Sequence, residues 1–297
     1  MTYQIQQIDF ESEGETLAAD FYMPNQIEQP PVIIMANGFA CERRFSLPNV
    51  AAEFAEQGFA VVLFDYRGFA ESTGEPRELV SPSHHLQDWS NVVRQVQQWN
   101  SVDLTQLFLW GVSFSGGHVM TIASQMNGIR GIIALVPHVD GLASAMKYPK
   151  KYFFSALKLA LKDVLNMTLG RPPVRIPVVS EQGVACLAGE ENYAAFMATV
   201  PKNSSWLGQV PARIMLDINR YRPICIADKI KCPVLLIAAK NDSLIPFQSI
   251  QKTTQKIPQV QFESFDMTHF DIVNKDSCFF QQGMQLQIQF LKQYVSS

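Results

Sequence analysis

Five short, mostly apolar runs constrain the fold of this chain more than any other feature. They are too short for helices of the usual 10–12 residues, and the first, Val-Ile-Ile-Met-Ala, is continuous and rich in β-branched residues, so they predict strands buried on both faces, as in a parallel sheet. The runs span 32–36, 59–64, 107–110, 129–136 and 232–239. Between the first four, apolar residues recur with helical spacing at 48–57, 82–99 and 115–126. This alternation predicts right-handed βαβ units around a mostly parallel sheet flanked by helices, an α/β fold.

Further elements are expected at both ends of the chain. Residues 3–10 and 16–23 resemble two strands of a hairpin around the Glu-Gly-Glu turn at 13–15. After the run at 232–239, the pattern predicts a helix near 247–256, a strand at 260–265 and a terminal helix at 277–295.

The alternation stops between the fourth and fifth strands. Residues 138–230 are mainly of helical pattern, interrupted by prolines and rich in aromatic residues and Met. We therefore expect an α/β core formed by 1–137 and 231–297, with 138–230 inserted as a helical cap over the carboxyl edge of the sheet, where ligands bind. The 297 residues, 47% hydrophobic and only 17% charged, suit one large domain with its own lid.

Composition also narrows the class of protein. The net charge is −3, from 24 basic and 27 acidic residues, so no nucleic-acid partner is expected. The five cysteines form no CxxC pair, which favours a reducing compartment and no zinc site. Without a signal peptide or an apolar stretch of ~18 residues, we expect a cytoplasmic protein with no membrane span. The oligomeric state stays open, a homodimer being one possibility.

The strongest chemical signal is the segment 111–115, Gly-Val-Ser-Phe-Ser, between a buried strand and a helix. This is the pattern of a nucleophile elbow, a tight turn whose small neighbours leave the serine hydroxyl exposed. Ser115 stands where the strict pattern has Gly, and could itself be the nucleophile in a shifted frame. The end of the strand at Trp110-Gly111 favours Ser113, although a Gly/Ser-rich turn without chemistry gives the same letters.

A nucleophilic serine needs a base and an orienting acid. Among the five histidines, His269 is the candidate base, because it lies in a loop at the carboxyl end of the last strand, on the side where Ser113 is expected. His118 is expected to be packed in a helix, and His84 and His85 to be surface or capping residues. Asp242 follows the strand ending at 239 and is the candidate acid.

Asp140, after the strand at 129–136, is the rival acid, and Asp242 could instead be a turn or cap residue. The chain order Ser113, Asp242, His269 is that of an α/β-hydrolase sheet. Two backbone N–H groups are expected to form the oxyanion hole, those of Phe114 after the nucleophile and Phe39 after Gly38.

Taken together, these motifs make the chain resemble the α/β-hydrolase fold superfamily over about two-thirds of its length. Asn37-Gly38-Phe39 resembles the His-Gly-x oxyanion loop, residues 65–69 (Asp-Tyr-Arg-Gly-Phe) the Asp-x-Arg-Gly-x segment, and residues 111–118 the elbow. The chain is most similar to bacterial dienelactone-hydrolase, X-Pro dipeptidyl-peptidase-like and polyketide-associated acyl hydrolases. It departs from the pattern at Asn37 and Ser115. Asp65 and Arg67 are expected to form a structural ion pair rather than to bind substrate, and Asp88 to brace a helix.

The expected function is a serine hydrolase that cleaves a carboxylic ester or thioester of a small to medium, rather apolar acyl substrate without metal or organic cofactor. The same triad would also serve a peptidase or amidase, a carbon–carbon hydrolase or an acyltransferase. A non-catalytic protein that binds small ligands is another alternative. A haloalkane-type dehalogenase is a weaker one, since an Asp would be expected in place of Ser113.

Overall fold

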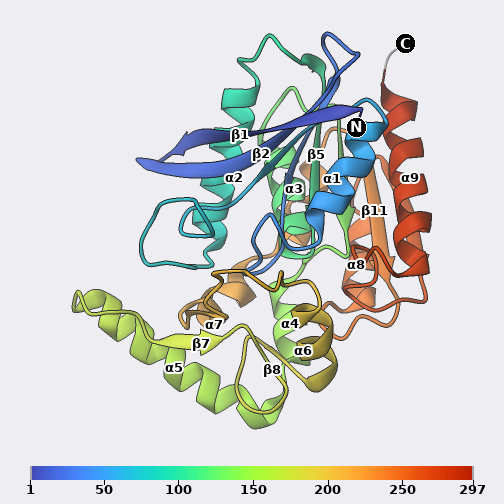
Figure 1. The fold of residues 1–297 in the computed structure, drawn as a ribbon. Helices are drawn as coiled ribbons and strands as arrows, with labels where there is room; N and C mark the ends of the chain where they lie inside the picture. Colours follow the sequence, from blue (N-terminus) through green and yellow to red (C-terminus); the bar gives the residue numbers. More distant parts are fainter. Residues whose placement is uncertain (1, 296–297) are drawn as a thin grey trace.

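A computed structural model describes residues 2–295, and its centre is one eight-stranded sheet (Figure 1). The strand order is β1-β2-β4-β3-β5-β6-β11-β12. β1 and β2 form an antiparallel hairpin at one edge, and β2 is antiparallel to β4; from β4 to β12 all neighbours are parallel. The strands are β1 Tyr3–Ser12, β2 Glu15–Pro24, β3 Pro31–Ala36, β4 Ala60–Phe64, β5 Asp103–Val112, β6 Gly131–Leu135, β11 Val234–Ala239 and β12 Val260–Phe265. The expected α/β fold is confirmed.

Helices cover both faces of the sheet. They are α1 Leu47–Glu56, α2 Pro82–Val96, α3 Phe114–Gln125, α8 Phe247–Thr254 and α9 Cys278–Tyr294. Alternate residues of β3 point to opposite faces: Ile34 belongs to the hydrophobic cluster packed with α2, α3 and α8, and Ile33 to the cluster packed with α1 and α9. The central strands β3, β4, β6 and β11 are therefore apolar throughout because each face has its own hydrophobic core.

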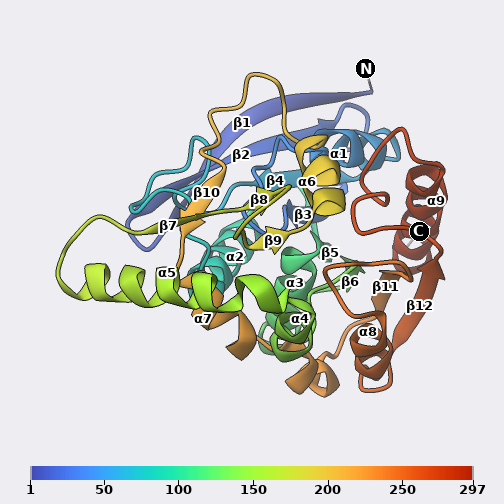
Figure 2. The same cartoon turned by 90° about the horizontal axis from the view of Figure 1, so that it is seen from below.

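The segment between β6 and β11, where the sequence predicts the insertion 138–230, lies beyond one end of the sheet (Figures 1 and 2). Its helices are α4 Gly141–Lys147, α5 Lys150–Thr168, α6 Glu190–Met197 and α7 Ile214–Asp217, with short 3₁₀ turns at Ile218–Arg220, Pro223–Cys225 and Ala227–Lys229. It also contains two small sheets, which the expectation of a helical segment missed. They pair β7 Arg175–Pro177 with β10 Gln209–Pro211, and β8 Val179–Ser180 with β9 Leu187–Ala188.

Candidate active site

The turn between β5 and α3 holds Ser113 in an unusual backbone conformation. Its φ is 56° and its ψ −118°, a region that residues with a Cβ rarely adopt. Two hydrogen bonds fix the turn: the Ser113 N–H donates to the Leu135 carbonyl at 2.8 Å, and the Ser113 carbonyl accepts from the His138 N–H at 2.8 Å. Both partners belong to the end of β6 or the loop after it, so the neighbouring strand sets the direction of the Ser113 side chain.

The backbone packs so closely around Ser113 that only small residues fit beside it. A Cβ on Gly111 would lie 2.3 Å from the Ser115 carbonyl oxygen, and one on Gly117 would lie 2.3 Å from the His138 carbonyl oxygen. The tight strand-to-helix turn therefore depends on these glycines, which is the physical reason for the sequence pattern.

The structure brings Ser113, His269 and Asp242 together. His269 Nε2 lies 2.9 Å from Ser113 Oγ, and His269 Nδ1 lies 2.7 Å from Asp242 Oδ2. His269 follows β12, Asp242 follows β11 and Ser113 follows β5, so three carboxyl ends of parallel strands meet here. The arrangement can pass a proton from the hydroxyl to the imidazole, while the carboxylate holds the ring in one orientation.

Asp242 is itself fixed by its own loop. Its Oδ1 accepts the backbone N–H groups of Leu244 and Ile245, each at 2.8 Å, which leaves Oδ2 for the imidazole. From the insertion, Lys147 Nζ donates to the Asp242 backbone carbonyl at 2.7 Å. The acid thus serves as the turn residue that the sequence also allowed, and contacts His269 as well.

Asp140, the alternative acid, and Ser115, the alternative nucleophile, bond to other residues. Asp140 caps the start of α4 and pairs with Arg222, whose Nε lies 2.8 Å from Asp140 Oδ1. Ser115 is fully buried, and its hydroxyl accepts from Tyr66 Oη at 3.1 Å. Neither side chain contacts His269.

The two expected oxyanion donors lie beside the elbow. Phe114 is the first residue of α3, so its N–H has no acceptor within the helix. The Phe39 N–H has no hydrogen-bond partner among residues 2–295, and the Phe39 and Phe114 rings make an edge contact at 5.6 Å. Asn37, which stands where the resemblance implies a His, stabilises this loop: its Nδ2 donates to the Glu42 and Phe45 carbonyls at 2.9 Å each.

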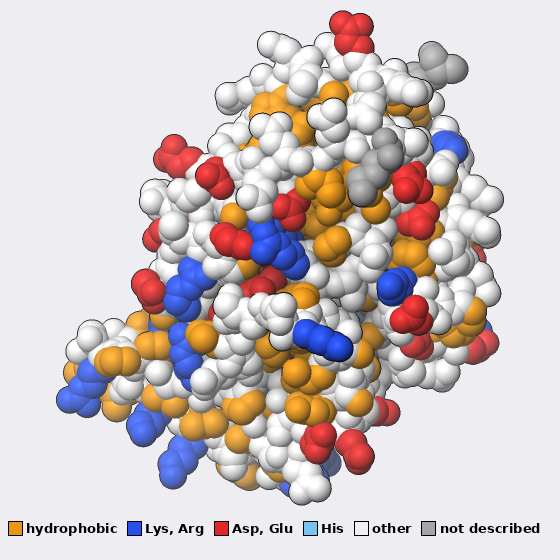
Figure 3. All heavy atoms as spheres, in the orientation of Figure 1, with side chains coloured by type: hydrophobic (Ala, Val, Ile, Leu, Met, Phe, Trp, Pro, Cys, Tyr) orange, Lys and Arg blue, Asp and Glu red, His pale blue; other side chains and the backbone are white. Residues whose placement is uncertain are grey.

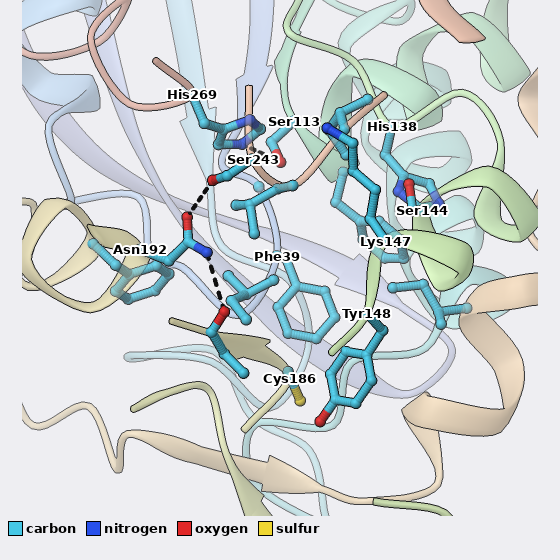
Figure 4. Close-up of a pocket in the computed structure, with 18 of the residues that line it drawn as sticks. Phe39, Ser113, His138, Ser144, Lys147, Tyr148, Cys186, Asn192, Ser243 and His269 are labelled. Atoms are coloured by element: carbon cyan, nitrogen blue, oxygen red, sulfur yellow. Dashed lines mark hydrogen bonds between the residues drawn. The ribbon is translucent and has the colours of Figure 1, made fainter. Parts of the chain in front are cut away.

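A cavity of about 420 Å³ opens above Ser113 and His269, between the strand ends and the insertion (Figure 4). Its lining is mostly apolar, with a few polar side chains that the sequence did not reveal. The apolar members include Phe39, Phe114, Phe153, Leu157, Leu187, Met215, Leu216 and Phe270; the polar ones include His138, Ser144, Lys147, Asn192 and Asn219. Since both the sheet edge and the insertion contribute, a ligand bound here would contact both.

Two cysteines, Cys41 and Cys186, also line the cavity. Burial raises the pKa of both thiols well above the usual range, so they stay protonated and are poor nucleophiles. Within residues 2–295, no cluster of three or more His, Cys, Asp or Glu side chains could hold a metal ion. None of the helices in this range has the length and apolar character needed to cross a bilayer.

The charged segment after β4 makes structural contacts. Arg67 pairs with Asp88, its Nη2 lying 2.6 Å from Oδ1, whereas Asp65 bonds to Arg43, which the sequence did not single out. Arg43 is buried and also contacts Asp20 and Glu71, at 3.0 and 2.8 Å.

His85 corrects an expectation: it is buried rather than on the surface. Its ring stacks on Tyr66 at 3.9 Å, and its Nδ1 lies 3.3 Å from Nε2 of His118, which is packed inside α3. These two histidines therefore belong to the core beneath the elbow.

Comparisons with known proteins agree with this fold. The quorum-quenching protein AidA of Acinetobacter baumannii (strain MDR-ZJ06) is 31% identical over 97% of this chain and 94% of its own. The thiohydrolase aneE of Aspergillus aculeatus is 24% identical over 88% of this chain and 85% of its own. The crystal structure of the α/β hydrolase GrgF from Penicillium sp. sh18 superimposes with a TM-score of 0.83 at 22% identity, covering 98% of this chain and 99% of its own.

A family profile described as "Serine aminopeptidase, S33" (Hydrolase_4) matches residues 28–274, most of the chain. The match includes the loop at Asn37-Gly38-Phe39, the turn at Ser113 and the loops that carry Asp242 and His269. The chain therefore belongs to this S33 family, and is a hydrolase of the α/β-hydrolase fold.

Proposed function

We propose that the protein is a serine hydrolase that cleaves a carboxylic ester or thioester of a small to medium, rather apolar acyl group. The observation that carries the proposal is the continuous hydrogen-bonded line from Ser113 Oγ through His269 to Asp242, with distances of 2.9 and 2.7 Å. A buried serine–imidazole–carboxylate line of this kind activates the serine as a nucleophile.

In the proposed reaction, His269 takes the Ser113 proton as Oγ attacks the acyl carbon. The backbone N–H groups of Phe39 and Phe114 would stabilise the tetrahedral oxyanion, each contributing about 3 kcal/mol to the transition state. Protonated His269 gives the proton to the leaving alcohol or thiol, and an acyl ester remains on Ser113. Water, activated by His269, then releases the acid.

The choice of acyl substrates rests on the cavity. It is lined by aromatic and aliphatic side chains and is large enough for a medium-sized acyl chain. Among the described residues that line it, Glu191 is the one carboxylate and is exposed to solvent, so no buried carboxylate there would neutralise the ammonium group of an aminoacyl substrate. A relative named as a thiohydrolase adds support for a thioester. We infer further that residues 138–230 act as a lid, because they supply one side of this cavity.

Labelling with a fluorophosphonate, followed by an ester assay, tests the proposal. Wild-type protein should label, and Ser113→Ala should abolish labelling and lower kcat by about 10⁴-fold or more. Ser115→Ala is the matched control, the same substitution two residues further along, and should keep labelling. Wild-type protein that does not label, or labelling that survives Ser113→Ala, would overturn the proposal.

Parallel assays separate the reactions that one triad can perform. We expect p-nitrophenyl butanoate and butanoyl thioesters to be hydrolysed faster than alanine or alanyl-proline p-nitroanilides. Faster cleavage of the anilides would make the protein a peptidase. Transfer of the acyl group to an added alcohol in preference to water would make it an acyltransferase.

A further inference from the structure

His138 lies between the elbow and the cavity. It follows β6, its N–H donates to the Ser113 carbonyl at 2.8 Å, and its ring centre lies 5.3 Å from that of Phe114. Figure 4 shows it on the same side of the cavity as Ser144 and Lys147, with Asn192 on the other side. The His138 imidazole can therefore contact a bound substrate close to the substrate carbonyl that Ser113 would attack.

The His138 ring presents a hydrogen-bond acceptor to this space. The ring donates to the backbone carbonyl of Tyr221 and is almost fully buried, and burial lowers its pKa to about 4. The imidazole is thus neutral near pH 7, and its second nitrogen carries a free lone pair. That nitrogen, Nε2, is buried and has no hydrogen-bond partner among residues 2–295.

Two more polar atoms in the same cavity share this property. Ser144 Oγ on α4 and Asn219 Oδ1 on the 3₁₀ turn after α7 are both buried without a partner within the described chain. Their elements pack closely, because a Cβ on Gly141 at the start of α4 would meet the Ile218 carbonyl oxygen. Buried polar atoms are nearly always hydrogen-bonded, so three exceptions lining one cavity indicate atoms kept for a ligand.

The chemistry of the three atoms indicates what they bind. A neutral imidazole nitrogen and an amide oxygen accept hydrogen bonds, and a serine hydroxyl both accepts and donates. A hydroxyl group complements this set, because it can donate to His138 and accept from Ser144. A carbonyl group fits worse, since it would leave both acceptors, His138 Nε2 and Asn219 Oδ1, unpaired, whereas a hydroxyl leaves Asn219 Oδ1 alone, which water can satisfy. Water can satisfy the atoms in the free protein, and a substrate hydroxyl would replace it.

We propose that His138, Ser144 and Asn219 form a polar subsite that binds a hydroxyl group on the acyl chain, close to the carbonyl attacked by Ser113. The substrate would then be a hydroxyacyl ester or thioester rather than a plain fatty acyl one. This proposal rests on the proposed function, since it places the hydroxyl relative to that carbonyl.

The test compares kcat/KM for p-nitrophenyl esters of butanoic, 2-hydroxybutanoic, 3-hydroxybutanoic and 3-oxobutanoic acid. We normalise each by its rate of spontaneous hydrolysis, because the substituents change the reactivity of the ester. At least one hydroxy ester should exceed butanoate by roughly tenfold, and the 3-oxo ester should not. Equal normalised values for all four esters would overturn the subsite.

Ser144→Ala should lower that preference by roughly tenfold. Because Ser144 Oγ has no partner in the described chain, this change should leave Tm unchanged or raise it. Ser155→Ala, on the exposed side of α5 and outside the cavity, is the matched control and should keep the preference. His138→Phe, which retains a ring but no acceptor, should also reduce it.

The outcomes separate the two proposals. A preference for the hydroxy ester that survives both Ser144→Ala and His138→Phe would show that other atoms bind the hydroxyl, and would overturn the subsite. Folded wild-type protein that neither labels with fluorophosphonate nor cleaves any of the esters would instead overturn the proposed function. Labelling and hydrolysis without hydroxy preference would leave the function standing and remove only the subsite.

Discussion

The sheet buries nearly all of its hydrophobic side chains, whereas the insertion leaves many of its own exposed. Every residue of β4, β6 and β11 is buried, whereas α5 buries only Ala156, Ala160 and Asp163 of its 19 residues. Of the twelve large hydrophobic side chains exposed among residues 2–295, ten lie in the insertion. Figure 3 shows many of them along the lower left of the molecule, interspersed with basic side chains.

The two regions therefore differ in how much apolar area they bury. The sheet is packed between two hydrophobic clusters, and the insertion adds a smaller set of residues, among them Ile176, Phe196 and Ile214, to one of these clusters. Specific polar contacts also fix the shape of the insertion. Asp163 illustrates them: it is fully buried, accepts the Val174 N–H at 2.8 Å and forms an ion pair with Arg213 at 2.7 Å.

We expect Asp163→Ala to have the largest effect, because it should destabilise the insertion and leave the sheet folded. Removing the carboxylate leaves a largely buried guanidinium and two backbone N–H groups without their acceptor, at a cost of about 3–5 kcal/mol. We expect faster hydrogen exchange and proteolysis in α5, with the amides of β5 and β6 still protected. The exposed Asp228→Ala is the control. Equal loss of protection in sheet and insertion would show that the two regions unfold together.

A smaller effect should come from the sheet region, through His85. Burial lowers the pKa of His85 to about 3, below the ~6.5 of an unfolded chain, so the unfolded state binds the extra proton as pH falls. Its contribution to stability is complete above about pH 6.5 and is lost towards pH 3. Between pH 7.5 and 5 this amounts to about 2 kcal/mol.

Urea unfolding at both pH values measures this effect. The loss of unfolding free energy between pH 7.5 and 5 should be about 2 kcal/mol smaller in His85→Leu than in wild type. His84→Leu, at a half-buried neighbouring position, should change the pH dependence less. An unchanged pH dependence in His85→Leu would mean that other groups cause it.

The smallest effect should come from the exposed face of α5. Phe154 is 79% exposed, so Phe154→Ser should change the unfolding free energy by less than about 0.5 kcal/mol. In the sheet, Phe108 is fully buried, and Phe108→Ala should cost about 3–5 kcal/mol. Urea unfolding of both variants compares the loss of unfolding free energy in the two regions. A large loss in Phe154→Ser would mean that a partner, such as a second copy, covers this face.

The same contrast explains what the sequence could predict. Strands buried on both faces appear as continuous apolar runs, so the strands of the parallel sheet were found. The apolar pattern starts at 107 although β5 begins at Asp103, because the polar Asp103, Thr105 and Gln106 hide the first residues of the strand from the pattern. The two- and three-residue strands of the insertion are too short for any period to show.

The candidate triad could be predicted because each member follows a recognisable strand. His85 could not be placed correctly because polar residues precede it, and only the packing of α2 onto Tyr66 buries it. His138 was missed for a similar reason. The sequence does not show that His138 Nε2 lacks a hydrogen-bond partner. Which ring nitrogen is paired depends on the backbone of Tyr221, which lies far away in the sequence.

The backbone of Ser113 has a consequence for how this protein can change over generations. A non-glycine residue at φ 56° costs of the order of 1 kcal/mol. Glycine would relieve that cost and remove the hydroxyl, so selection for stability and selection for reactivity oppose each other at this position. Copies that have lost their activity should therefore drift towards glycine at 113, while the surrounding sheet retains its sequence pattern.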